Sequence, residues 1–164
     1  MIRYAAIDDA KTICDIYNYY VRNTAITFEE QPVLVEDMQS RMADVIASLP
    51  WLVSERTGVV IGYAYASKWK SRSAYRFSVE SAIYLAPEMH GRGAGRELYE
   101  ALISDLRSRA IHAMIAVVSL PNPGSIALHE RMGFEKIAHL KEVGWKFGSW
   151  IDVGYWELIL TQRA

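Results

Sequence analysis

The chain of 164 residues has 18 basic and 19 acidic side chains, and its net charge of −1 gives no general attraction to nucleic acid or to an anionic membrane. Its length and a hydrophobic content of 51% favour a single domain over residues 1–164. A lone Cys14 excludes an internal disulfide, no apolar run approaches the ~20 residues of a membrane span, and no signal-peptide pattern is present, which together favour the cytoplasm.

The N-terminal part of the chain predicts one strand, two amphipathic helices and a β-hairpin. Asp8 or Asp9 is suited to cap the first helix, whose apolar stripe follows i, i+3, i+4 spacing. Cys14 lies on that stripe and is interpreted as a small core residue, because no base that would activate it is evident nearby. Thr57-Gly58 is a hairpin signal. The predicted elements are strand 2–6, a helix ending near Arg22, loop 23–34, helix 35–48, and strands 51–56 and 59–67.

The C-terminal part alternates strands with helices. A basic, aromatic loop over 68–76 opens it, and an aromatic, Gly-rich loop over 144–150 is expected between its last two strands. The predicted elements are strand 77–85, helix 94–110, strand 112–119, turn 121–124, helix 125–132, and strands 134–143 and 152–161. Because hairpins and helical crossovers both occur, we expect an α/β (α+β) fold with a mixed central sheet of about seven strands flanked by about four helices.

Three glycines at alternate positions, Gly91, Gly93 and Gly95, lie where strand 77–85 leads into helix 94–110. Glycine permits a tight turn and the close approach of another molecule, and a helix start presents free N–H groups and the positive end of its dipole. This combination predicts an anion site, most naturally for a phosphate or pyrophosphate. The chain lacks the G-x-x-x-x-G-K-[ST] of a P-loop, and the turn has neither the spacing nor the early position of a dinucleotide fingerprint.

The turn His90–Arg96 resembles the acetyl-CoA pyrophosphate loop of the GCN5-related N-acetyltransferases (GNAT), usually written R/Q-x-x-G-x-G/A. Residues 122–134 are similar to the second cofactor motif of that family, N-x-x-S-x-x-L-(aromatic or His)-x-x-x-G-F. The segments that further resemble its phosphinothricin and methionine sulfoximine acetyltransferase branch are 16–20, 27–29, 79–85 and 144–154. The resemblance implies a GNAT fold, acetyl-CoA-dependent acetylation of the α-amine of a small amino-acid-like substrate, and a homodimer.

The resemblance also implies that acetyl-CoA binds at the glycine turn and along the preceding strand, with no metal. Backbone N–H groups near the end of that strand are expected to contact the pantetheine arm and the oxyanion. His90 stands where the family usually has Arg or Gln and also reads as an ordinary exposed turn residue, while Asn122 also reads as a helix cap. The implied cofactor-binding residues are Ile83, Tyr84, Leu85, His90, Gly91, Arg92, Gly93, Ala94, Gly95, Arg96, Asn122 and Ser125.

Glu80 is the candidate general base. Alternation along the strand places it on one face with Tyr84, and a carboxylate within so apolar a strand is costly unless it is used or paired. Partial burial would raise its pKa toward the working range of a base, whereas the alternative is an ion pair with Arg76 or another neighbour. His129 stands where many relatives carry a tyrosine acid, and imidazole suits that role, but a packed helix residue is the alternative.

The basic loop fits a clamp for a carboxylate or phosphinate, because Arg pairs such groups through two hydrogen bonds. Nucleic acid is disfavoured since the basic patch is short, and the alternatives are a solvated loop here and simple packing for the aromatic residues that would close the pocket. The implied substrate-binding residues are Phe28, Glu29, Lys70, Ser71, Arg72, Tyr75, Arg76, Glu80, Ser81, Ala82 and Trp145.

Two other functions are compatible with the same motifs. One is acetylation of a protein N-terminus or of another amine, which an open groove in place of an enclosed, cationic pocket would favour. The other is a non-catalytic acyl-CoA-binding module, against which the carboxylate of Glu80 argues.

Overall fold

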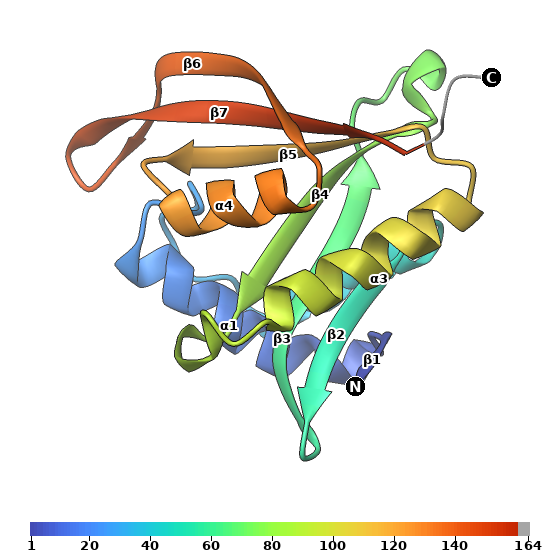
Figure 1. Cartoon of the computed structure of the whole chain (residues 1–164). Helices are drawn as coiled ribbons and strands as arrows, with labels where there is room; N and C mark the ends of the chain where they lie inside the picture. The colour runs from blue at the N-terminus through green and yellow to red at the C-terminus, as the bar shows by residue number, and fades with distance from the viewer. Residues whose placement is uncertain (161–164) are drawn as a thin grey trace.

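The structure, a computed structural model, describes residues 1–160 and is built on a mixed seven-stranded sheet in the order β1-β2-β3-β4-β5-β7-β6 (Figure 1). The neighbouring strands are antiparallel except β4 and β5, which are parallel and joined through a helix. The predicted mixed sheet is therefore confirmed. The strands are β1 (Ile2–Tyr4), β2 (Trp51–Arg56), β3 (Val59–Lys68), β4 (Ser78–Leu85), β5 (Ala113–Leu120), β6 (Glu135–Lys146) and β7 (Ser149–Ile159).

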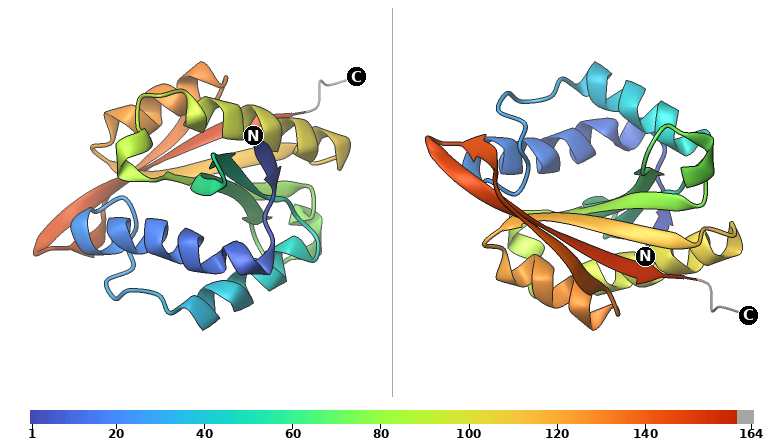
Figure 2. Two further views of the ribbon diagram at one scale, coloured as in Figure 1. Left: turned by 90° about the horizontal axis from the view of Figure 1, so that it is seen from below. Right: turned by 90° about the horizontal axis from the view of Figure 1, so that it is seen from above.

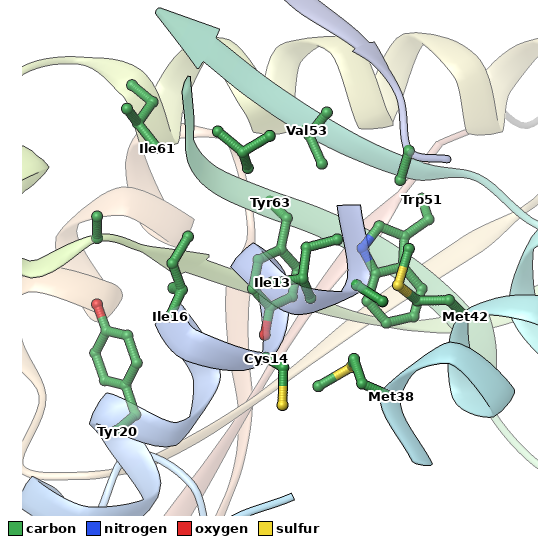
Figure 3. Close-up of a cluster of buried hydrophobic side chains, with 14 of the residues drawn as sticks. Ile13, Cys14, Ile16, Tyr20, Met38, Met42, Trp51, Val53, Ile61 and Tyr63 are labelled. Atoms are coloured by element: carbon green, nitrogen blue, oxygen red, sulfur yellow. The ribbon is translucent and has the colours of Figure 1, made fainter. Parts of the chain in front are cut away.

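Helices cover both faces of the sheet, with α1 and α2 on one face and α3 and α4 on the other (Figure 2). On the α1/α2 face, Ile13 and Met42 pack against Trp51 and Tyr63 of the central strands (Figure 3). The helices are α1 (Ala10–Asn23), α2 (Val35–Ile46), α3 (Ala94–Ser108) and α4 (Pro123–Arg131), with short 3₁₀ turns at Ile7–Asp9, Ser73–Tyr75 and Pro87–Met89. The core of the α3/α4 face is built from Leu98, Tyr99, Leu102, Leu106, Met114 and Trp156. No helix of residues 1–160 is both long and apolar enough to cross a membrane.

Cys14 is a core residue, as the apolar stripe predicts. Its side chain is 2% exposed, and its Sγ lies 3.1 Å from the backbone carbonyl of Val33, to which it donates. Burial raises the pKa of the thiol, which disfavours the thiolate that a nucleophile needs.

Asp9 occupies the predicted cap position of α1, but its side chain makes no capping hydrogen bond to that helix. A 3₁₀ turn precedes the helix, and the Asp9 carboxylate accepts a hydrogen bond from the Ala6 N–H at 2.8 Å. The same carboxylate lies 2.7 Å from the guanidinium of Arg3, whose hydrogen bond holds the pKa of Asp9 below its usual range. Asp9 thus ties β1, which ends at Tyr4, to the start of α1 at Ala10.

The parallel pair β4 and β5 diverges partway along its length. Their pairing stops at Ser81↔Ala116, while β4 remains paired with β3 as far as Leu85↔Gly62. The remainder of β4 therefore has one edge that is not covered by β5. We call this opening the β4–β5 gap.

Hydrogen-bond alternation shows which backbone groups face the β4–β5 gap. The Ala86 N–H donates to Ile61 at 2.9 Å, and the Trp69 N–H donates to Ser78 at 3.3 Å, so even-numbered residues of β4 bond to β3. The N–H and C=O groups of the odd-numbered Ile83 and Leu85 consequently face the gap. The backbone of Tyr84 faces β3, which corrects the prediction that its N–H contacts the cofactor.

The predicted loop over 144–150 is instead the end of a long hairpin. Strand β6 continues through Lys146 and β7 begins at Ser149, with Phe147 (φ 52°) and Gly148 (φ 72°) forming the turn between them. Two successive residues with positive φ are typical of a type I′ turn, which matches the twist of paired strands. The hairpin extends beyond the helical layers (Figure 1). The predicted end of the last strand at Thr161 lies outside the described residues.

Candidate active site

A cavity of about 420 Å³ opens at the β4–β5 gap, between the end of β4, the turn before α3, and the first turns of α4. Its lining also includes residues that were not expected from the sequence, namely Tyr20, Ile26 and Arg131. Tyr20 was not expected because it belongs to the core-facing stripe of α1. Of the predicted cofactor residues, Arg92 and Ala94 do not line the cavity. Those that do are Ile83, Tyr84, Leu85, His90, Gly91, Gly93, Gly95, Arg96, Asn122 and Ser125.

The glycine turn forms one end of this cavity. Gly91 and Gly93 have φ angles of +72° and +85°, and no atom lies within 4 Å of where a Cβ would be at either position. Gly95 has a different role, since its Cβ would lie 3.3 Å from the side chain of Leu128 in α4. The first two glycines therefore provide the turn, and the third allows α3 and α4 to pack closely.

The start of α3 supplies hydrogen-bond donors at this end of the cavity. The helix begins at Ala94, and Glu97 is the residue whose N–H donates back to Gly93, at 3.1 Å. The N–H groups of the first three residues of a helix have no partner within it, and the dipole adds positive potential there. With Arg96 and Arg131 on the cavity wall, this end is suited to an anionic group.

Asn122 acts as the cap of α4. Its side-chain oxygen accepts a hydrogen bond from the Ser125 N–H at 3.2 Å, and Pro123 occupies the first helical position. This is the capping geometry that the sequence also allowed. Because Asn122 lines the cavity as well, capping and a ligand contact are compatible.

Glu80 lies on β4 immediately before the β4–β5 gap, with Ser67 of β3 and Ile115 of β5 as its cross-strand neighbours. Its side chain is half-buried, on the α1/α2 face of the sheet. Burial raises the pKa of its carboxyl above the usual 4.5, and the nearby Lys70 ammonium partly offsets that rise. In the described part of the chain no cation forms an ion pair with Glu80 within 4.0 Å, so the predicted alternative of a pair with Arg76 is not found.

Only part of the predicted basic clamp lies near Glu80. The Lys70 ammonium acts electrostatically on Glu80 and lies 4.6 Å from the centre of the Trp69 ring. Arg76 instead lines a separate cavity of about 210 Å³ on the α3 side, together with Lys68 and Arg109. The remaining loop residues Ser71, Arg72 and Tyr75 are exposed.

The predicted substrate-binding residues Ser81 and Ala82 on β4 point to opposite faces of the sheet. Ala82 lies on the same face as Glu80, opposite Tyr65 of β3. Ser81 is buried on the other face, where its Oγ is 3.3 Å from the Tyr99 hydroxyl and donates to the Ile115 carbonyl at the same distance. Its side chain therefore does not lie beside Glu80.

Loop residues 27–29 pack against the β6–β7 hairpin. The ring of Phe28 lies over Gly144, where an added Cβ would come within 2.3 Å of it. The buried ammonium of Lys146 donates to the Thr27 carbonyl at 2.7 Å, and burial lowers its pKa. Glu29 is held by Arg41 of α2 at 2.6 Å, a partner that sequence patterns did not reveal.

Trp145, a predicted substrate-binding residue, lies on the face of the β6–β7 hairpin that is turned away from loop residues 27–29. Because side chains alternate along a strand, it faces away from the side that Gly144 and Lys146 present to the loop. Its ring packs edge-on against Trp150 at 4.8 Å, and its side chain is 50% exposed. Within one chain, Phe28 and Glu29 therefore lie against the face of the hairpin opposite to the one that carries the Trp145 side chain.

His129 forms a buried hydrogen bond with Tyr99 that connects α4 to α3. Its Nδ1 lies 2.7 Å from the Ser125 carbonyl, which can only accept, so Nδ1 carries the proton. Its Nε2 therefore accepts from the Tyr99 hydroxyl at 2.7 Å. The residue is 3% exposed and does not line the cavity. This geometry favours the packed interpretation of His129 over the acid role.

We expect His129 to make the protein less stable in mild acid. Burial lowers its pKa below the ordinary 6.5, so the unfolded chain binds a proton more readily than the folded chain. The associated stability is complete above pH 6.5 and is lost as the pH falls through that value toward the lower pKa of the folded state. Melting temperatures across this range should fall less steeply for His129→Gln than for the wild type. Equal slopes in the two proteins would contradict the assignment.

The chain is similar to known acetyltransferases over almost its whole length. Residues 2–154 match the family model of the acetyltransferase (GNAT) domain. The phosphinothricin N-acetyltransferase of Alcaligenes faecalis is 42% identical over 164 residues, covering 99% of this chain and 81% of that protein. The L-methionine sulfoximine/L-methionine sulfone acetyltransferase of Salmonella typhimurium is 37% identical over 167 residues, covering 99% of this chain and 96% of that protein.

A solved structure matches the whole fold and contains a ligand. It is yncA from Salmonella typhimurium with its cofactor acetyl-CoA, and it matches with a TM-score of 0.96 at 36% identity. The match covers 100% of this chain and 95% of that chain. The residues described here contain no group of three or more His, Cys, Asp or Glu side chains placed to hold a metal ion.

Proposed function

The chain belongs to the GNAT family of N-acetyltransferases, in its phosphinothricin and methionine sulfoximine acetyltransferase branch, and we propose that its acceptor is the α-amine of a small amino-acid-like molecule. As a member of this group it is an acetyl-CoA-dependent N-acetyltransferase. The observation that carries the proposal is Glu80, a half-buried carboxylate without an ion-pair partner in residues 1–160, placed where β4 and β5 diverge.

The main cavity provides the acetyl-CoA side of the site. The N–H groups at the start of α3, with Arg96, are placed to bind the pyrophosphate. The gap-facing backbone groups of Ile83 and Leu85 are placed to hydrogen-bond the pantetheine arm as a further strand would. We assign these contacts to the cavity because its lining joins both sets of donors.

Amide formation requires a neutral amine held near the thioester carbon, and donors for the charge that develops on the carbonyl oxygen. We assign proton acceptance from the amine to Glu80, directly or through a water molecule, because burial brings its pKa closer to the working pH. Backbone N–H groups at the β4–β5 gap would stabilise the oxyanion. Cys14 is buried in the α1/α2 core, which supports direct attack on the thioester without an acyl-enzyme.

The acceptor side lies on the α1/α2 face. Of the cations predicted to clamp a substrate carboxylate or phosphinate, we assign this role to Lys70, because its ammonium acts on Glu80 electrostatically. A zwitterionic amino acid would place its amine at Glu80 and its carboxylate toward Lys70. The relatives named for phosphinothricin and methionine sulfoximine acetylation support acceptors of this size.

A thiol-release screen tests the acceptor. Wild-type protein with acetyl-CoA should release free thiol with phosphinothricin, methionine sulfoximine, methionine sulfone or ordinary L-amino acids, and should not do so with their N-blocked forms. A preference for peptides with a free N-terminus would indicate protein acetylation instead. Acetyl-CoA binding without thiol release for any amine would indicate the non-catalytic module.

We also propose that the chain forms a homodimer through the β6–β7 hairpin. Val143, Phe147 and Trp150 are 57%, 63% and 62% exposed there, and large apolar side chains exposed on one hairpin are typical of subunit contacts. Analytical ultracentrifugation of the wild type and of Trp150→Ser should show a dimer and a shift toward monomer, respectively. A monomeric wild type would contradict the proposal.

A further inference from the structure

Tyr20 connects helix α1 to two segments that line the main cavity, the end of β4 and the glycine turn. Its hydroxyl lies 2.5 Å from the carbonyl of Leu85 at the end of β4, and 2.7 Å from Nε2 of His90 at the start of the glycine turn. The ring centroids of Tyr20 and His90 lie 6.2 Å apart with their planes inclined by 30°, and the Tyr84 ring packs against Tyr20 at 5.3 Å. Tyr20, Leu85 and His90 all line the cavity.

The directions of these two hydrogen bonds follow from the number of protons. A backbone carbonyl can only accept, so the single hydroxyl proton of Tyr20 is donated to Leu85. The hydroxyl oxygen is then the acceptor for His90, whose Nε2 carries the proton. Burial raises the pKa of Tyr20 to about 12, which keeps this hydroxyl protonated. The result is a continuous chain from His90 through Tyr20 to Leu85.

We infer that Tyr20 and His90 form a positioning pair that fixes the glycine turn relative to the end of β4. This inference rests on the proposed function, because these two segments would bind the pyrophosphate and the pantetheine arm of acetyl-CoA. The Leu85 carbonyl faces the β4–β5 gap, so its orientation matters for a ligand lying there. Neither side chain needs to contact the reacting atoms, and the pair acts by holding the binding groups in place before acetyl-CoA arrives.

The pair also gives a role to His90 at a position where the family usually has Arg or Gln. Its side chain is exposed on one side and bonded to Tyr20 on the other, so it belongs to the turn and to the cavity wall. Within the turn, backbone N–H groups still face the anion, and His90 contributes by orientation. A Gln at this position retains an N–H donor for Tyr20, whereas a Leu does not.

Calorimetric titration with acetyl-CoA in the absence of any acceptor tests the inference. Tyr20→Phe keeps the ring and removes the hydroxyl, and it should weaken acetyl-CoA binding about three- to tenfold, as expected for one or two lost hydrogen bonds. Tyr19→Phe is the matched control, because the neighbouring Tyr19 is 41% exposed and does not line the cavity. Its affinity should equal that of the wild type.

The His90 variants separate positioning from general damage to the fold. His90→Leu should weaken binding about as much as Tyr20→Phe, His90→Gln should restore most of the affinity, and the double variant Tyr20→Phe/His90→Leu should be no weaker than either single variant. The loss of activity should be larger at limiting than at saturating acetyl-CoA, because the pair acts on binding. Because His90 is exposed, its variants test the pair even if Tyr20→Phe is poorly folded.

The possible outcomes are distinct. Additive losses in the double variant, or unchanged affinity in both single variants, would overturn the positioning pair. A wild-type protein that does not bind acetyl-CoA would instead overturn the proposed function.

Discussion

Replacing Glu80 with glutamine is expected to lower kcat by about 10²- to 10⁴-fold, the range typical of a lost general base. Glutamine keeps the size and hydrogen-bonding reach of the side chain but cannot accept a proton from the amine. Acetyl-CoA should bind to the variant as tightly as to the wild type, because Glu80 lies on the α1/α2 face and does not line the main cavity. Steady-state thiol release and calorimetry measure the two quantities separately.

The pH profile gives a second readout of the same group. Because burial raises the pKa of Glu80 above 4.5, the acid limb of kcat/KM should lie above that value and should disappear in the variant. Glu157→Gln is the control, since Glu157 is half-buried on the same row of the sheet, opposite Ile115. Wild-type turnover in Glu80→Gln, or an equal loss in Glu157→Gln, would remove Glu80 from the role of base.

The order of strands and helices was predictable because each element carries its own hydrophobic period. Strand β4 alternates, α1 and α3 follow the helical spacing, and Thr57-Gly58 forms the predicted hairpin turn. The cofactor motifs are local as well, since a turn and the helix that follows it define an anion site within a few residues. This is why most of the predicted cofactor residues line a single cavity.

Aromatic and glycine content alone did not distinguish a loop from a hairpin at 144–150. Gly144 and Gly148 suggested a loop, but Gly148 provides the positive φ of a two-residue turn, and Gly144 leaves room for the ring of Phe28. The need for glycine at position 144 comes from Phe28, which is more than a hundred residues away in the sequence. The hydrogen bond from Lys146 to Thr27 joins segments equally far apart. Patterns within a short window carry no information about such contacts.

The acceptor side was predicted less well for the same reason. Arg76 and Ser81 are close to Glu80 in sequence, yet one lines a separate cavity and the other faces the opposite side of the sheet. Tyr20 was placed in the core by its spacing, and only the fold shows that its hydroxyl reaches β4 and the glycine turn, 65 and 70 residues further along. A core residue with a polar end can therefore belong to a binding site without any local signal.

Gly93→Val is expected to raise the KM for acetyl-CoA by about a hundredfold, which corresponds to about 2.7 kcal/mol of lost binding free energy. Gly93 has a φ of +85° at the start of α3, a conformation that a β-branched residue adopts only with strain. The strain would tilt the first N–H groups of α3 away from the cavity, and the new side chain would project into the space where the anion binds. Saturation kinetics with acetyl-CoA as the varied substrate measure the effect.

Gly58→Val separates this loss from the cost of backbone strain. Gly58 has a φ of +79° in the β2–β3 turn, and, as for Gly93, no atom lies within 4 Å of an added Cβ. Both variants should therefore lose a similar free energy of unfolding, about 1–2 kcal/mol. Only Gly93→Val should lose affinity for acetyl-CoA, because Gly93 lines the cavity and Gly58 does not. If both variants showed the same KM, the glycine turn would be needed only for folding, and the pyrophosphate would have to bind elsewhere.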